Sequence, residues 1–217
     1  MNSAIIFDLD GTLIDSLADL AEAINRMLDE HDYPRRDLAV FPEFIGDGMR
    51  KLVERALPEE VRTDAIIDAC VLDYQRHYET LWHDQTVPYP GIVEVLAELR
   101  RRGVPLGVLS NKPQRFTELC CTHFFPGCFD LVLGARESVP RKPHPAAASD
   151  ISERFGLPLA NCAYVGDSGI DMEFATRAGM HGIGVRWGFR GEAELRANGA
   201  RVIISDPAEL LGWVATR

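Results

Sequence analysis

Near its start the chain reads Ile5-Ile6-Phe7-Asp8-Leu9-Asp10-Gly11-Thr12-Leu13. The first residues of this stretch are apolar and too few for a helix, which predicts a buried strand. Two carboxylates, Asp8 and Asp10, stand where Gly11 would end that strand. In α/β sheets, ligands bind at such strand ends. Because neighbouring carboxylates repel each other, we expect either a cation beside them or a proton on one of them.

The composition limits the classes of partner. Of the 217 residues, 46% are hydrophobic, enough for a sizeable core. The net charge of -10 disfavours nucleic acid and membrane partners, because both nucleic acid and anionic lipid need a basic surface. A small anionic metabolite stays possible, since local cations and a metal can override the overall charge. We find no secretory signal and no apolar run of about 18 residues, and five cysteines suit a reducing cytosol, so we expect a cytoplasmic protein.

One group of residues raises the question of zinc: Cys120, Cys121, His123 and Cys128. Their spacing fits none of the usual zinc patterns, and the first two cysteines lie in an apolar helical stretch. We therefore expect buried thiols at these positions rather than a zinc site.

The middle of the chain has only helical patterns. Apolar residues at helical spacing predict helices over 17–28, 49–57 and 59–83. Asp15 and Ser16 are candidate N-cap residues of the first helix. A glycine-broken turn, Gly46-Asp47-Gly48, precedes the second helix, and no strand pattern is convincing between Leu17 and His83.

From Pro88-Tyr89-Pro90-Gly91 onward, strands alternate with helices. The expected strands are 105–109, 131–133, 163–165, 183–185 and 202–204, and the last helix begins at Pro207. Such alternation predicts a parallel sheet with helices on both faces. The predicted fold class is α/β, with a Rossmann-like core domain (1–15 and 86–217) and an inserted all-helical cap domain (16–85).

Polar side chains gather at the ends of the predicted strands. They are Asp8 and Asp10; Ser110, Asn111 and Lys112; Lys142; and Asp167 with Asp171. Each has a simpler interpretation by itself, as a helix cap or as a solvated loop charge. Because the carboxyl ends of parallel strands meet at one edge, these groups are expected to share a crevice. Their recurrence favours metal and phosphate chemistry.

These motifs resemble those of the haloacid dehalogenase superfamily of phosphohydrolases, in the group that carries a helical cap. The four matching elements are Asp8-Leu9-Asp10-Gly11-Thr12, Ser110, Lys142 and Gly166-Asp167-Ser168-Gly169-Ile170-Asp171. They occur in the family's order over nearly the whole chain. Shorter stretches resemble phosphoglycolate phosphatases: Phe44-Ile45-Gly46-Asp47-Gly48, Glu54-Arg55-Ala56-Leu57, Tyr89-Pro90-Gly91, Ser110-Asn111-Lys112-Pro113 and Trp187-Gly188.

The resemblance implies a role for each core residue. Asp8 would be the nucleophile that forms an aspartyl-phosphate, and Asp10 the general acid and base. Mg2+ suits an all-oxygen site, and its ligands would be Asp8, the backbone carbonyl of Asp10 and Asp167. Asp171 would hold a metal-bound water from the adjacent shell. Lys142 would offset negative charge near Asp8 and the phosphoryl group.

The resemblance also implies substrate contacts, at Thr12, Gly46, Asp47, Gly48, Arg50, Ser110, Asn111 and Lys112. Ser110 and the backbone at Asn111 would bind phosphate oxygens. Backbone N–H groups of the Gly46-Asp47-Gly48 loop would meet a substrate carboxylate, with Arg50 assisting. The plain alternatives are a helix–helix turn for the loop and a solvated charge for Arg50.

The implied activity is an Mg2+-dependent phosphatase of a small phosphate monoester, with 2-phosphoglycolate the leading candidate. Alternatives on the same fold are a sugar-phosphate phosphatase, a β-phosphoglucomutase-like phosphotransferase and a phosphonate hydrolase. Thr12 weakly disfavours a mutase. A phosphonate hydrolase would need a Schiff-base lysine in the cap, and Lys51, the one lysine of the cap, lacks the expected motif around it. A catalytically silent protein is a further alternative. Such a protein could have lost any catalytic residue, whereas here a suitable residue stands at every catalytic position, which argues against it.

Overall fold

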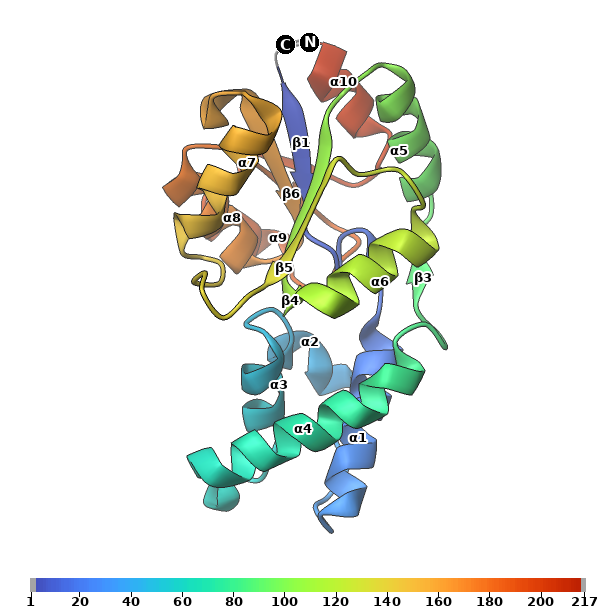
Figure 1. Ribbon diagram of the computed structural model, residues 1–217, viewed down its shortest axis with the longest axis vertical. Helices are drawn as coiled ribbons and strands as arrows, with labels where there is room; N and C mark the ends of the chain where they lie inside the picture. The colour runs from blue at the N-terminus through green and yellow to red at the C-terminus, as the bar shows by residue number, and fades with distance from the viewer. Residues whose placement is uncertain (1–2, 216–217) are drawn as a thin grey trace.

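The computed structural model describes residues 3–215 and contains a six-stranded parallel sheet of order β5-β4-β1-β6-β7-β8 (Figure 1). The strands are β1 (Ala4–Phe7), β4 (Leu106–Pro113), β5 (Leu131–Ala135), β6 (Cys162–Gly166), β7 (His181–Val185) and β8 (Val202–Ile204). The opening stretch of the sequence thus lies in the middle of the sheet, between β4 and β6. The α/β prediction is confirmed.

Helices cover both faces of the sheet (Figure 1). One face packs against α5 (Ile92–Arg101), α6 (Gln114–Phe124) and α10 (Glu209–Ala215), and the other against α7 (Ala148–Phe155) and α8 (Gly169–Ala178). A further helix, α9 (Glu192–Ala197), lies between β7 and β8 in the chain.

Strand β1 shows why its sequence is apolar throughout. Ile5 and Phe7 belong to the core cluster under α5 and α6, whereas Ala4 and Ile6 belong to the cluster under α7 and α8. Successive side chains of a strand point to opposite faces, and here both faces are buried.

The inserted helices form a second layer beyond the ends of the strands (Figure 1). They are α1 (Leu17–Glu30), α2 (Phe41–Phe44), α3 (Met49–Ala56) and α4 (Asp64–Leu81). They enclose their own hydrophobic cluster, which includes Ile24, Met27, Val53 and Tyr74 and also takes in Phe116 from α6. Below, these helices are called the cap.

A two-stranded antiparallel ribbon lies where the chain enters and leaves the cap. It pairs β2 (Ile14–Asp15) with β3 (Val87–Pro88). These strands were not predicted, because two residues are too few to establish an alternating pattern. The ribbon lies beside the domain boundaries expected from the sequence.

Three local expectations were wrong in detail. The helix expected over 59–83 is a 3-10 turn, Glu59–Val61, followed by α4, which starts at Asp64 because the Thr63 side chain accepts a hydrogen bond from the backbone N–H of Ile66. Ser16 occupies the N-cap position of α1 as predicted, but its hydroxyl makes no capping bond. The strand expected over 105–109 continues to Pro113.

The cysteines of α6 are buried, whereas Cys128 is half-buried, and all five thiols are free. Burial raises the pKa of Cys120 to about 11, so its thiol stays protonated at neutral pH. Within residues 3–215, no helix combines the length and apolarity needed to cross a bilayer.

Candidate active site

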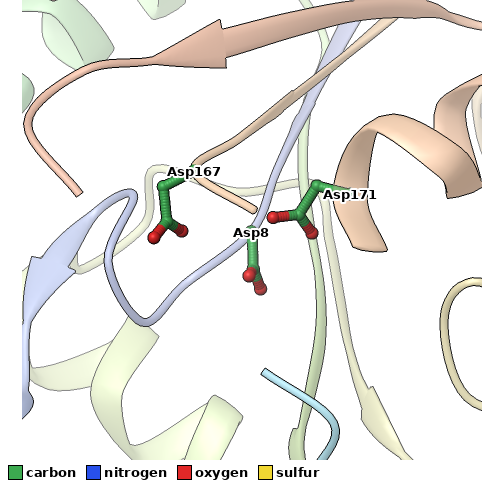
Figure 2. Close-up of side chains that lie close together, drawn as sticks. All are labelled: Asp8, Asp167 and Asp171. Carbon is green, nitrogen blue, oxygen red and sulfur yellow. The ribbon is translucent and has the colours of Figure 1, made fainter. Parts of the chain in front are cut away.

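Three carboxylates converge at the ends of the central strands (Figure 2). Asp8 follows β1, Asp167 follows β6, and Asp171 lies in the first turn of α8. One oxygen of each carboxylate lies within 4.8 Å of the others. Residues about 160 positions apart in the chain are thus brought together because β1 and β6 are neighbours in the sheet.

The chemistry of this cluster fits a bound cation. Asp8 Oδ1 is buried, and the Lys142 ammonium lies 3.0 Å from it without the geometry of a regular hydrogen bond. Desolvation raises the pKa of Asp8 to about 7, although the positive charge of Lys142 offsets part of this effect. The pKa of Asp167 is raised to about 8 by desolvation and by the negative charges of Asp171 and Asp8. A divalent cation would relieve the resistance of Asp8 and Asp167 to ionisation, and the all-oxygen set of the three acids suits Mg2+.

Asp167 and Asp171 differ in how their oxygens are occupied. Asp167 accepts from the Thr12 hydroxyl (3.0 Å) and from the backbone N–H of Phe189 (2.8 Å). Asp171 Oδ1 accepts from Lys142 Nζ (2.7 Å), and its Oδ2 accepts two bonds from Ser168. Because Asp171 is already paired with the Lys142 ammonium, whereas Asp167 accepts only from neutral donors, Asp171 is better suited to a supporting position than to direct coordination.

Glycine at position 188 lets the loop after β7 approach this site. A Cβ there would collide with the Asp167 side chain and with the carbonyl of Gly11. The close approach brings the Phe189 N–H within reach of Asp167 and the Trp187 indole N–H to the carbonyl of Thr12 (3.0 Å).

Lys142 is a buried cation beside Asp8, not a solvated loop charge. Its Nζ lies 3.0 Å from Asp8 Oδ1 and donates to Asp171 and to the Tyr164 hydroxyl (2.6 Å), which itself donates to the carbonyl of Leu109. Burial opposes its charge, but Asp171 and Asp8 outweigh burial and raise its pKa. Tyr164 was not predicted, because it lies within an apolar strand pattern like any core aromatic residue.

An irregularity in β4 aims its polar residues at the site. Pairing with β5 jumps from Leu109–Leu133 to Pro113–Ala135, so two extra residues bulge from β4 around Ser110, Asn111 and Lys112. All three line one cavity with Asp8 and Asp10. This cavity, which we call the active-site pocket, leaves about 550 Å³ of empty space, counting the solvent at its mouth.

Asn111 holds two other segments with its side chain. Its Oδ1 accepts from the backbone N–H of Lys142 (2.9 Å), and its Nδ2 donates to the carbonyls of Lys142 (3.0 Å) and Gly46 (2.9 Å). Because the side-chain amide of Asn111 is engaged in these bonds, only the backbone of this residue remains to bind a ligand. A second donor, Arg190, reaches the cap at the carbonyl of Ile45 (3.2 Å).

The Asp10 side chain is fixed by two neighbours. Ser16 Oγ donates to Oδ1 (2.6 Å), and Lys112 Nζ donates to both oxygens (2.8 and 3.1 Å). Asp10 therefore has surroundings unlike those of Asp8, which lies with Lys142 and the acid cluster. Neither partner of Asp10 was anticipated as such from the sequence.

The cap contributes mostly apolar walls to the active-site pocket. Gly46 and Gly48 line it, together with Leu20, Ile45, Met49, Leu52, Tyr74, Tyr78 and, from the core, Pro113 and Phe116. Two predicted contacts do not reach it. Arg50 pairs with Asp64 and Asp68 on α4, and Asp47 pairs with Arg55. Thr12, also predicted to bind substrate, is instead engaged by Asp167.

A family model described as haloacid dehalogenase-like hydrolase matches residues 5–185. The chain belongs to this family. Among its relatives, the phosphoglycolate phosphatase of Pseudomonas putida is 33% identical over 212 residues, which cover 95% of this chain and 78% of the relative. The phosphoglycolate phosphatase of Aliivibrio fischeri is 34% identical over 191 residues, covering 85% and 84%.

Solved structures agree with this placement in the haloacid dehalogenase-like hydrolases. A crystal structure from Lactobacillus delbrueckii subsp. bulgaricus, described as a candidate phosphoglycolate phosphatase, superposes with a TM-score of 0.91 at 31% identity and covers 98% of both chains. Together these matches confirm the prediction of a phosphoric monoester hydrolase that resembles phosphoglycolate phosphatases.

The raised acid pKa values predict how metal should affect stability. Without metal, the folded state holds the protons of Asp8 and Asp167 more tightly than the unfolded state, so their contribution to the free energy of unfolding falls as pH rises from about 4 to about 8. Mg2+ should therefore raise the Tm by several degrees more at pH 8 than at pH 5.

Scanning calorimetry at matched ionic strength would check this, with NaCl in place of MgCl2 as control. Asp167→Asn should lose most of the Mg2+-dependent rise. An equal Mg2+ shift at both pH values would contradict this account of the acid cluster.

Proposed function

We propose that the chain is an Mg2+-dependent phosphatase that hydrolyses 2-phosphoglycolate through an aspartyl-phosphate on Asp8. The observation that carries the proposal is the position of Asp8, which lines the active-site pocket, lies 3.0 Å from the Lys142 ammonium and belongs to the acid cluster with Asp167 and Asp171. The relatives named phosphoglycolate phosphatase support the choice of substrate.

Asp8, Asp167 and the backbone carbonyl of Asp10 would hold the metal. Bound there, Mg2+ would neutralise part of the phosphate charge that otherwise repels a carboxylate nucleophile. The chain itself supplies a second cation in Lys142, which is fixed beside Asp8 by Tyr164 and Asp171. Ser110 and the backbone of Asn111 would bind the phosphate oxygens.

In the first step a carboxylate oxygen of Asp8 forms a bond to phosphorus, and the ester P–O bond breaks. Asp10, in its protonated form, gives its proton to the departing alkoxide, so that the alcohol leaves neutral. Charge that develops on the phosphoryl oxygens is met by Lys142, Ser110 and the backbone N–H groups around Asn111.

In the second step water cleaves the aspartyl-phosphate. Asp10, now a carboxylate, takes a proton from the attacking water, and the P–O bond to Asp8 breaks to release inorganic phosphate. Asp8 and Asp10 thus return to their starting states. The cap shields the intermediate, because the Asn111 and Arg190 contacts hold its loop against the strand ends.

The walls of the pocket favour a compact substrate. Leu20, Ile45, Met49 and Leu52 offer few partners for the several hydroxyls of a sugar, which would be left without hydrogen bonds. A carboxylate could instead meet the N-terminus of α3, whose N-cap residue Gly48 has no side chain to cap the helix. The five free cysteines fit a cytoplasmic location for such an enzyme.

Phosphate release from a panel of esters tests the proposal. With Mg2+, kcat/KM for 2-phosphoglycolate should exceed that for glycerol phosphate and for glucose 1- and 6-phosphate by about tenfold or more. EDTA should remove the activity and added Mg2+ should restore it. Absence of turnover on every ester would refute the phosphatase, whereas a preference for a glucose phosphate would refute only the substrate.

A further inference from the structure

The mechanism above leaves one buried cation of the pocket without a role. Lys112, on the bulge of β4, is 7% exposed. Its ammonium donates to both oxygens of Asp10 (2.8 and 3.1 Å) and to the hydroxyl of Tyr78 (2.7 Å). An ammonium has three N–H donors, so all of them are directed at these two residues. Burying such a charge is costly unless it is paired, and within residues 3–215 Asp10 is its one acidic partner.

Tyr78 fixes the other end of this contact and belongs to the cap. It is 1% exposed on α4, its ring lies 4.9 Å from that of Phe116, and it stacks on Tyr74 at 5.7 Å. Lys112 Nζ also lies 4.7 Å from the centroid of the Tyr78 ring. The ring packing leaves the hydroxyl little freedom, so the Lys112 ammonium is held from the cap side.

The contact therefore runs from the cap through Lys112 to Asp10. Ser16, at the start of the cap, holds one oxygen of the same carboxylate (2.6 Å). If the cap moved away, Tyr78 would leave Lys112, and the lysine would keep only its contact to Asp10. The orientation of Asp10 is thus defined most completely when the cap covers the strand ends, which is the arrangement secured by Asn111 and Arg190.

We propose that Tyr78 and Lys112 are a positioning pair that orients the Asp10 carboxyl for proton transfer when the cap is closed. The inference rests on the proposed function, because it assumes that Asp10 protonates the leaving group. The pair would act through Asp10 rather than on the reacting phosphorus, since the Lys112 ammonium is directed at Asp10 and Tyr78. Their effect should depend on how much the leaving group needs a proton, which distinguishes positioning from a general loss of structure.

Two phosphate esters separate these possibilities. The alkoxide of an alkyl phosphate such as 2-phosphoglycolate needs a proton as it departs, whereas p-nitrophenolate leaves as an anion. In Tyr78→Phe, which removes the hydroxyl and keeps the ring, the first turnover of the alkyl phosphate should slow about 10-fold or more. The first-turnover burst of p-nitrophenolate should stay within about twofold of wild type, and KM for the alkyl phosphate within about threefold.

Lys112→Met removes the charge and keeps the length of the side chain, and it should show the same pattern with a larger loss. Tyr74→Phe is the matched control, since it removes a hydroxyl from the same wall without breaking a contact to Lys112. Any change it causes should be equal for the two esters. If Lys112→Met does not fold, Tyr78→Phe decides the question alone.

The outcomes keep this inference separate from the proposed function. If wild type turns over no alkyl phosphate, the proposed function fails, and the positioning role fails with it. If wild type is active and Tyr78→Phe slows both esters equally, or neither, the positioning pair is overturned while the phosphatase stands. The alkyl phosphate for the test is the best substrate of the panel.

Discussion

Replacing Asp8 with asparagine should lower turnover of every phosphate ester by at least about 10⁴-fold, because an amide cannot attack phosphorus to form the acyl phosphate. The amide occupies nearly the same space, so the fold should persist. Intact-protein mass spectrometry after acid quenching should find a phosphorylated chain in wild type during turnover and none in the variant.

Although Asp8→Asn should abolish activity, we expect it to raise the stability of the metal-free protein. It removes one of the three clustered carboxylates, whose pKa is raised to about 7, so the metal-free variant should melt above metal-free wild type at pH 8. Asp15→Asn, an exposed acid outside the pocket, is the control for both measurements. Full activity in Asp8→Asn would sink the proposed mechanism outright.

Asp10→Asn should slow both chemical steps, each by about 10²- to 10⁴-fold, since asparagine can neither give nor take the proton. Quenched-flow measurement would show slow formation and slow decay of the phosphorylated chain. Mg2+ affinity, measured from the metal-dependent rise in Tm, should change by less than about threefold, because the proposed metal ligand at this position is the backbone carbonyl.

Two results would count against this division of roles. A large loss of Mg2+ affinity in Asp10→Asn would make the side chain a metal ligand. Normal formation with slow decay would restrict Asp10 to the second step. In the structure the two aspartates already differ in surroundings, since Asp8 faces Lys142 while Asp10 is held by Lys112 and Ser16.

The strand ends could be predicted from the sequence because each motif is local. The apolar run before Asp8 and the capping pattern around Asp171 need only a few neighbouring residues to be recognised, and parallel topology then places their ends on one edge. The helix-cap interpretation of Asp171 is confirmed, since its side chain completes the capping box of α8, whereas its bond from Lys142 was not predicted and its part in holding a metal-bound water stays a prediction.

Contacts between distant segments could not be predicted in this way. Tyr164 and Tyr78 occupy ordinary apolar positions of a strand and a helix. The sequence pattern is the same for a tyrosine whose hydroxyl binds a lysine as for one that only packs in the core. The direction of Arg50 depended on α4, where Asp64 and Asp68, one helical turn apart, attract its guanidinium away from the pocket.

The loop after β7 links the proposed metal site to the cap. Phe189 binds Asp167, and the adjacent Arg190 binds a carbonyl of the cap, so one short segment contacts both the proposed metal ligand and the lid. Thermodynamic linkage makes such a coupling reciprocal. Whatever free energy metal binding contributed to closing the cap, cap closure would contribute equally to metal affinity, so that retention of the proposed cation and of the proposed substrate would be coupled.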